Sequence, residues 1–182
     1  MELDLIDKNV HRRENLTFYY QKPDDLPEGY LDKICKLVEA GGSVDTKFVR
    51  YNLEKAYLIA YVMDDGVIVG NSSLKHPRKE FITKINKIIN FDFTGFLERG
   101  YTSVKPEYRA FGIGTKLLGG LTARAENYKI FSIISEDNKA TQKIALRNNT
   151  KKIANYYSEK VGKEMGVWMP EHMIEKRWGL KL

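Results

Sequence analysis

The spacing of apolar residues along the chain predicts seven strands and five helices. The clearest strand pair is a hairpin, in which residues 57–63 and 67–70 flank Asp64-Asp65-Gly66, because glycine readily takes the positive φ that a tight turn requires. The clearest helix is 78–90, in which one face collects the apolar residues Phe81, Ile82, Ile85, Ile88 and Ile89.

The remaining elements follow the same two periodicities. We expect strands at 16–20, 96–104, 130–134, 153–157 and 167–169, and helices at 31–38, from Ser43 as N-cap to about 53, at 113–125 and from 139 onward. The order β-α-α-β-β-(α)-β-α-β-α-β-β predicts an α+β fold built on one mixed, mostly antiparallel central sheet flanked by helices. Because no linker divides the chain, we expect a single domain over 1–182, with 171–182 as a C-terminal tail.

Composition matters for what it excludes. The single cysteine, Cys35, rules out an intramolecular disulfide and favours a reducing compartment. His11, His76 and His172 have no Cys, His or carboxylate at metal-ligand spacing, so we expect no metal site. The charged start of the chain lacks the pattern of a signal peptide, and no apolar run reaches the length of a membrane span. We therefore expect a cytoplasmic protein without a membrane partner.

The net charge of +6 is unevenly distributed. Residues 1–30 carry four Lys or Arg against seven Asp or Glu, whereas residues 141–182 carry nine against four. A basic C-terminal third could attract anions such as a nucleotide phosphate, RNA or a membrane surface, although a solvated lysine-rich surface is the better explanation for most of these lysines. Nucleic acid is not the partner we expect, but charge alone leaves it open.

The most informative segment is 104–118, VKPEYRAFGIGTKLL, where a strand runs into a turn with two glycines and then directly into an amphipathic helix. The first amides of a helix lack intrahelical partners, and glycines let a phosphate approach them. Arg109 adds a permanent positive charge. A P-loop does not fit, because its Gly-Lys-Ser/Thr ending is missing, and the Rossmann pattern requires Gly or Ala where this chain has Leu117.

The segment resembles motif A of the GNAT acyl-CoA N-acyltransferases, whose pattern is read here as Val104, Pro106, Tyr108, Arg109, Gly112 and Gly114. The order of elements from about 16 to 169 is also that of the family. The resemblance implies a GNAT fold and acetyl-CoA as cosubstrate. It also implies that the CoA pyrophosphate binds at Arg109, Ala110, Phe111, Gly112, Ile113, Gly114 and Thr115. The alternative is a glycine-rich turn without a ligand.

Two further contacts are implied by the resemblance. In the family the strand before the turn carries a bulge, and its backbone pairs with the pantetheine arm. Those positions are Thr102, Ser103 and Val104 here, with the Val104 N–H directed at the thioester carbonyl. An Asn after the next strand binds CoA in the family, and the matching residue is Asn138. Asn is also a good N-cap, so Asn138 serves the following helix equally well, and the two roles are compatible.

Transfer to an amine requires a base, because an ammonium must lose a proton before its nitrogen can attack. Glu98 is the candidate general base. It lies eleven residues before Arg109, the spacing of the catalytic glutamate in the histone-acetyltransferase-like branch. The alternative for Glu98 is an ion pair with Arg99 or with a lysine on an adjacent strand.

The sequence departs from the family where many members carry a tyrosine that protonates the departing thiolate. That position is Ala145 here, so the general acid is unassigned and solvent is expected to supply the proton. Two classes of function remain: an N-acetyltransferase acting on a primary amine, and a non-catalytic acyl-CoA-binding or regulatory module. The acceptor, whether a small molecule, a protein amine or an aminoacyl-tRNA, and the length of the acyl group are open. A homodimer would be usual for the family.

Overall fold

The computed structural model describes residues 15–42 and 44–175. These residues form a seven-stranded sheet in the order β1-β2-β3-β4-β5-β7-β6. The strands are β1 (Thr17–Gln21), β2 (Leu58–Asp64), β3 (Val67–Lys75), β4 (Leu97–Val104), β5 (Ile130–Ser135), β6 (Thr150–Ser158) and β7 (Lys163–Pro170). The α-helices are α2 (Tyr30–Ala40), α3 (Val49–Glu54), α4 (Lys79–Ile89), α5 (Ile113–Ala123) and α6 (Lys139–Arg147). The predicted α+β order and mostly antiparallel sheet are confirmed.

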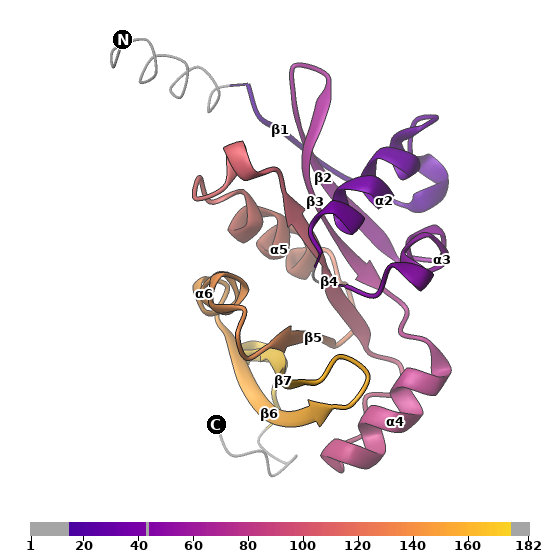
Figure 1. Ribbon diagram of the computed structural model, residues 1–182, viewed down its shortest axis with the longest axis vertical. Coiled ribbons are helices and arrows are strands. Elements are labelled where there is room, and N and C mark those ends of the chain that lie inside the picture. Colours follow the sequence, from indigo (N-terminus) through magenta and orange to yellow (C-terminus); the bar gives the residue numbers. More distant parts are fainter. Residues whose placement is uncertain (1–14, 43, 176–182) are drawn as a thin grey trace.

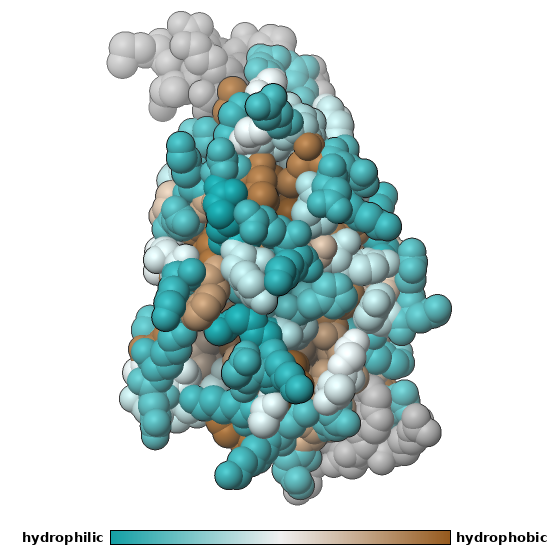
Figure 2. Space-filling view, turned by 90° about the vertical axis from the view of Figure 1, so that its right-hand side faces the viewer, coloured by the Kyte–Doolittle hydropathy of each residue, from teal (hydrophilic) through white to brown (hydrophobic). Residues whose placement is uncertain are grey.

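Helices cover both faces of the sheet. In Figure 1, α2, α3 and α4 lie on one side of it, and α5 and α6 lie on the other. Ile59 and Tyr61 of β2 pack against α2 and α3, whereas Ala60 and Val62 belong to the core that contains α5, as the alternation of a strand requires. Figure 2 shows that the surface on the side of α2, α3 and α4 is largely hydrophilic, with small hydrophobic patches between polar side chains.

Four local expectations need correction or comment. The expected N-cap Ser43 lies outside the described residues, and Asp45 instead caps a 3-10 helix, η2 (Thr46–Phe48), by accepting from the Lys47 N–H. Ile88 is 44% exposed rather than part of the buried face of α4. Strands β3, β6 and β7 are longer than predicted. In the expected tail, residues 171–173 form a 3-10 helix, and 176–182 lie outside the described residues.

Strands β4 and β5 are the parallel pair of the sheet, and they soon part. Their register pairs only Leu97 with Ile130 and Glu98 with Phe131, although the strands are eight and six residues long. Beyond these two pairs β5 continues beside β7, and the second half of β4 pairs with β3. Among the residues that the structure describes, no strand therefore pairs with the β5-facing edge of β4 over Gly100 to Val104.

Among the described residues, no helix has the length and apolar character to cross a lipid bilayer.

Candidate functional site

The turn before α5 has the backbone of an anion-binding loop. After the 3-10 helix η3 (Pro106–Tyr108), Ala110 has a φ of 65° and Gly112 has a φ of 76°, so two left-handed residues lie two positions apart. Gly112 is the N-cap of α5, and the first amides of α5 have no intrahelical acceptors. Left-handed residues and helix N-termini both make concavities of N–H groups that favour phosphate.

The two glycines of the turn have different reasons to be there. A Cβ at Gly112 would meet nothing within 4 Å, so glycine is favoured there by its positive φ and not by lack of space. A Cβ at Gly114 would lie 2.8 Å from Ile144 Cδ1, so glycine there allows α5 to pack against α6. The sequence interpretation, which assigned both glycines to phosphate access, therefore missed the packing role of Gly114.

The other motif residues tie the turn to the sheet. Arg109 is exposed, and its Nε donates to the Val104 carbonyl at 3.0 Å. The Tyr108 hydroxyl donates to Asp64 Oδ2 at 2.5 Å, which holds η3 against the β2–β3 hairpin. The hydroxyl of Thr115, at the start of α5, is buried and has no hydrogen-bond partner among the described residues.

Strand β4 carries the bulge that the resemblance implies. Its register against β3 pairs Asn71 with Ser103 but Ser73 with Gly100, so β4 contains one extra residue over this span. The extra residue produces a φ of 54° at Tyr101, an unusual value for a bulky side chain.

The bulge ends just before Val104, whose amide faces away from β3. The N–H of Lys105 donates to the Val69 carbonyl at 2.9 Å, which directs the Lys105 amide towards β3. Successive amides of a strand point to opposite edges. The Val104 N–H is therefore directed to the side where β5 has parted from β4, as expected for a donor to a bound thioester carbonyl.

Glu98 is paired with a buried lysine. Its Oε1 lies 3.4 Å from Lys75 Nζ, and the two side chains are 21% and 5% exposed. The ammonium of Lys75 also lies 3.6 Å from the centroid of the Tyr101 ring. The ion pair with a lysine on an adjacent strand, one of the two roles considered for Glu98, is thus present, and the role of Glu98 as a base stays a prediction.

Besides burial, the negative charge of Glu98 contributes to the raised pKa values of two tyrosines, Tyr156 and Tyr101. Burial, with the negative charge of Glu98, raises the pKa of Tyr156 to about 12. Burial also raises the pKa of Tyr101, and Glu98 acts in the same direction, against a hydrogen bond from Asn52 Nδ2 at 2.7 Å. A phenol with a raised pKa keeps its proton at neutral pH, so both tyrosines are neutral there.

Two residues considered in the sequence analysis belong to α6, since Asn138 is its N-cap and Ala145 lies within it. Asn138 Oδ1 accepts from the Thr141 N–H at 3.1 Å, so the capping role considered for Asn138 is present. Ala145 is completely buried against Ile134 and Trp168. This position therefore belongs to the packing between α6 and the sheet.

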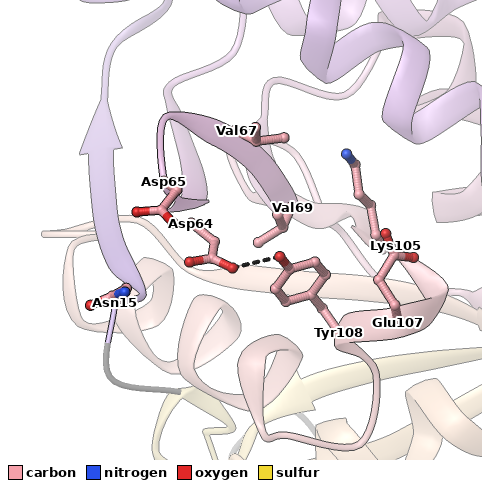
Figure 3. Close-up of a pocket in the computed structure, with 8 residues that line it drawn as sticks. All are labelled: Asn15, Asp64, Asp65, Val67, Val69, Lys105, Glu107 and Tyr108. Atoms are coloured by element: carbon pink, nitrogen blue, oxygen red, sulfur yellow. Dashed lines mark hydrogen bonds between the residues drawn. The ribbon is translucent and has the colours of Figure 1, made fainter. Parts of the chain in front are cut away.

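A pocket of about 350 Å³ lies beside the turn but does not suit a pyrophosphate. It is formed between the β2–β3 hairpin and η3, and Figure 3 shows its lining, which consists of Asn15, Asp64, Asp65, Val67, Val69, Lys105, Glu107 and Tyr108. Three carboxylates against one lysine repel an anion. Over 15–42 and 44–175, no group of three or more His, Cys, Asp or Glu is arranged to hold a metal ion.

Sequence reasoning missed the residues that β3 contributes, because the predicted strand ended at Gly70. The buried run Asn71-Ser72-Ser73 lies opposite the β4 bulge, and Lys75 lies opposite Glu98. The run Asn71-Ser72-Ser73 after an apolar strand resembles a loop, because Asn and Ser are common turn residues. The signal against a loop is that neither Gly nor Pro stands between Gly70 and Lys75.

The sequence matches no model of a known protein family, and it matches no curated protein. Solved structures of the same shape do exist. They include an acyl-CoA N-acyltransferase from Pseudomonas aeruginosa, with 15% identity, 85% of this chain and 99% of that chain covered, and a TM-score of 0.58. An IAA acetyltransferase from Bacillus cereus is 12% identical, and the match covers 84% of this chain and 97% of that chain with a TM-score of 0.60. Arabidopsis thaliana Naa50, solved with the bisubstrate analogue CoA-Ac-MVNAL, is 13% identical. The match covers 85% of this chain and 97% of that chain with a TM-score of 0.61.

These likenesses show the fold. The chain has the architecture of the GNAT acetyltransferases, as the resemblance of its turn implied, and it matches these proteins over nearly their whole length.

Proposed function

We propose that the protein is an N-acetyltransferase that transfers an acetyl group from acetyl-CoA to a primary amine of a small molecule or a protein. The observation that carries the proposal is the direction of the Val104 N–H, which points into the part of the sheet where β5 has left β4. The left-handed turn at the start of α5 follows within eight residues. One donor for a thioester carbonyl and one loop for a pyrophosphate are therefore joined by a single short segment. The CoA-bound structure of the Arabidopsis protein of the same fold supports this assignment.

The chemistry needs a proton acceptor and a donor for a developing negative charge. As the amine nitrogen forms its bond to the carbonyl carbon, the Val104 N–H stabilises the charge on the carbonyl oxygen. Glu98 accepts the proton that the amine loses, directly or through one water. When the carbon–oxygen double bond re-forms, the carbon–sulfur bond breaks and the thiolate departs. Solvent protonates the thiolate, because Ala145 offers no acid.

Two observations favour the second candidate, a non-catalytic acyl-CoA-binding module. The carboxylate of Glu98 is already engaged by Lys75, and the usual tyrosine is replaced by a buried alanine. Both candidates require the turn to bind CoA, and they differ in whether thiol is released. Incubating the protein with acetyl-CoA and a panel of primary amines, while measuring free thiol, separates them.

The turn itself is best tested with a matched pair of variants at Gly112. Asn and Asp tolerate a positive φ better than other residues with side chains do, and a Cβ at this position would meet nothing within 4 Å. We expect Gly112→Asp to weaken CoA binding by at least about 10-fold relative to Gly112→Asn, because only the carboxylate repels a pyrophosphate. Isothermal titration calorimetry with CoA measures the difference.

Equal CoA affinities of these two folded variants would show that the phosphates do not bind at this turn. The comparison does not depend on turnover, so it also tests the turn if the protein is a binding module.

A further inference from the structure

Strand β3 contains a polar run where a buried strand is normally apolar. Asn71, Ser72 and Ser73 are consecutive and have no exposed surface. Burying an amide or a hydroxyl costs free energy unless it is hydrogen-bonded. Such a run inside a sheet therefore requires specific partners.

All three side chains are bonded to the bulge of β4. Asn71 Nδ2 donates to the Tyr101 carbonyl at 2.8 Å, and Ser73 Oγ donates to the Gly100 carbonyl at 3.0 Å. Ser72 Oγ lies 3.4 Å from the same Gly100 carbonyl and 2.8 Å from Thr102 Oγ1. Because successive side chains of a strand point to opposite faces, the bulge is held from both faces of the sheet.

The bulge needs this support because its backbone is strained. A bulky residue such as Tyr101 at a φ of 54° costs about 1–3 kcal/mol, and such a conformation persists only when its surroundings hold it. If the extra residue were lost from the register, β4 would shift by one position against β3. A one-residue shift turns each amide to the opposite edge, so the Val104 N–H would then face β3.

Asn71 makes the shortest of these bonds to the bulge backbone, and it does so at a cost. Its Oδ1 is buried without a hydrogen-bond partner among the described residues. An unsatisfied buried acceptor destabilises a protein by about 1–3 kcal/mol. An aliphatic residue would avoid this cost but could not donate to the Tyr101 carbonyl.

We propose that Asn71 is a positioning residue of the acetyl-transfer site, which fixes the β4 bulge so that the Val104 N–H points at the thioester carbonyl. Ser72 and Ser73 support the same bulge at Gly100 and Thr102. The proposal rests on the proposed function, since it assigns a role in the same site, and these three side chains have no exposed surface with which to contact a substrate.

The test compares Asn71→Leu with the matched control Asn86→Leu. Asn86 also binds the backbone, through a bond of 2.8 Å from the Phe93 N–H to its Oδ1, but it lies at the end of α4. We expect Asn71→Leu to lower kcat by about 100-fold, the loss typical of removing one oxyanion donor, while the Kd for CoA changes by less than about threefold. Asn86→Leu should leave kcat near the wild-type value.

Amide hydrogen exchange over residues 98–104 gives a readout that does not require turnover. Exchange should accelerate in Asn71→Leu and remain unchanged in Asn86→Leu. If Asn71→Leu does not fold, Ser73→Ala is the milder variant, and we expect it to lower kcat by about 10-fold or less, because Ser72 still reaches the Gly100 carbonyl.

The possible failures are distinguishable. A wild-type protein that releases no thiol with any amine would refute the proposed function, and the exchange data would then still decide whether Asn71 holds the bulge. A wild-type enzyme whose Asn71→Leu variant keeps both kcat and slow exchange would refute the positioning role alone.

Discussion

The groups around Glu98 affect its proposed role as a general base. The Lys75 ammonium neutralises it at 3.4 Å, while Tyr101 and Tyr156 offer phenols whose pKa values are raised by burial and by Glu98. The ion pair holds the carboxylate in one place beside the bulge. A water between Glu98 and the amine would allow proton transfer without breaking the ion pair.

We expect Glu98→Gln to lower kcat by about 100-fold or more at neutral pH, because the amide cannot accept the proton of the acceptor. The loss should shrink as the pH rises, since the acceptor then deprotonates unaided. Glu136→Gln is the matched control, because Glu136 is also paired with a lysine, Lys152 at 3.0 Å, and is similarly exposed. A pH–rate profile of Glu98→Gln that coincides with the wild type would exclude Glu98 as the base.

At the scale of elements, the sequence predicts type and order well but misjudges where strands end. The hairpin around Gly66 and the helix after Gly112 follow from residues whose backbone preference is strong. The C-terminal half of β3 could not be predicted, because its residues Asn71-Ser72-Ser73 are polar and their hydrogen-bond partners lie in a bulge on the neighbouring strand β4. Spacing made Glu98 and the turn candidates, but it is the register between β3 and β4 that brings Lys75 opposite Glu98.

Helix α5 contains two glycines that its local sequence does not explain. Gly119 and Gly120 each cost about 1 kcal/mol relative to alanine in a helix. The structure gives the reason, since Tyr20 of β1 lies across Gly120, and its hydroxyl donates to the Lys116 carbonyl at 3.3 Å. A Cβ at Gly120 would lie 1.9 Å from the Tyr20 hydroxyl oxygen, whereas at Gly119 it would meet only Asn148 Oδ1, at 2.9 Å.

We therefore expect Gly120→Ala to destabilise the protein by about 1–2 kcal/mol, because the overlap with Tyr20 outweighs the gain in helix propensity. Gly119→Ala should be nearer to neutral, since its neighbour is the end of a side chain. Urea unfolding measures both free energies of unfolding. A Gly120→Ala protein more stable than the wild type would mean that Tyr20 does not pack across α5.

Across the whole molecule, a buried arginine joins the two halves of the sheet. Arg99 on β4 donates to Thr122 of α5 at 2.5 Å and to Thr150 of β6 at 3.0 Å. Burial lowers its pKa to about 10. A lowered pKa means that the folded state disfavours the charged form of Arg99. The free-energy cost of burying this charge should therefore diminish as the pH rises from about 10 towards the pKa that Arg has in the unfolded chain.

The tyrosines act in the opposite direction and outnumber Arg99. Burial raises the pKa values of a group of phenols, which are Tyr20, Tyr57, Tyr61, Tyr101 and Tyr156. A group with a raised folded-state pKa contributes stability that is complete below the unfolded value, about 10 for Tyr, and that is lost as the pH rises through the folded value. The protein should therefore lose stability above pH 10, in spite of the gain at Arg99.

Tyr156 should account for the largest identifiable share, because its pKa of about 12 leaves the widest interval in which only the unfolded chain loses the proton. We expect Tyr156→Phe to reduce the loss of unfolding free energy between about pH 9 and 11.5 by roughly 1 kcal/mol, allowing for partial solvent screening of the ring. Tyr157→Phe is the control on the same strand, because Tyr157 is 56% exposed, and it should follow the wild type. Urea unfolding at a series of pH values gives the slopes. If Tyr156→Phe and the wild type lose stability in parallel, then Tyr156 is not held protonated in the folded protein by burial and by the charge of Glu98.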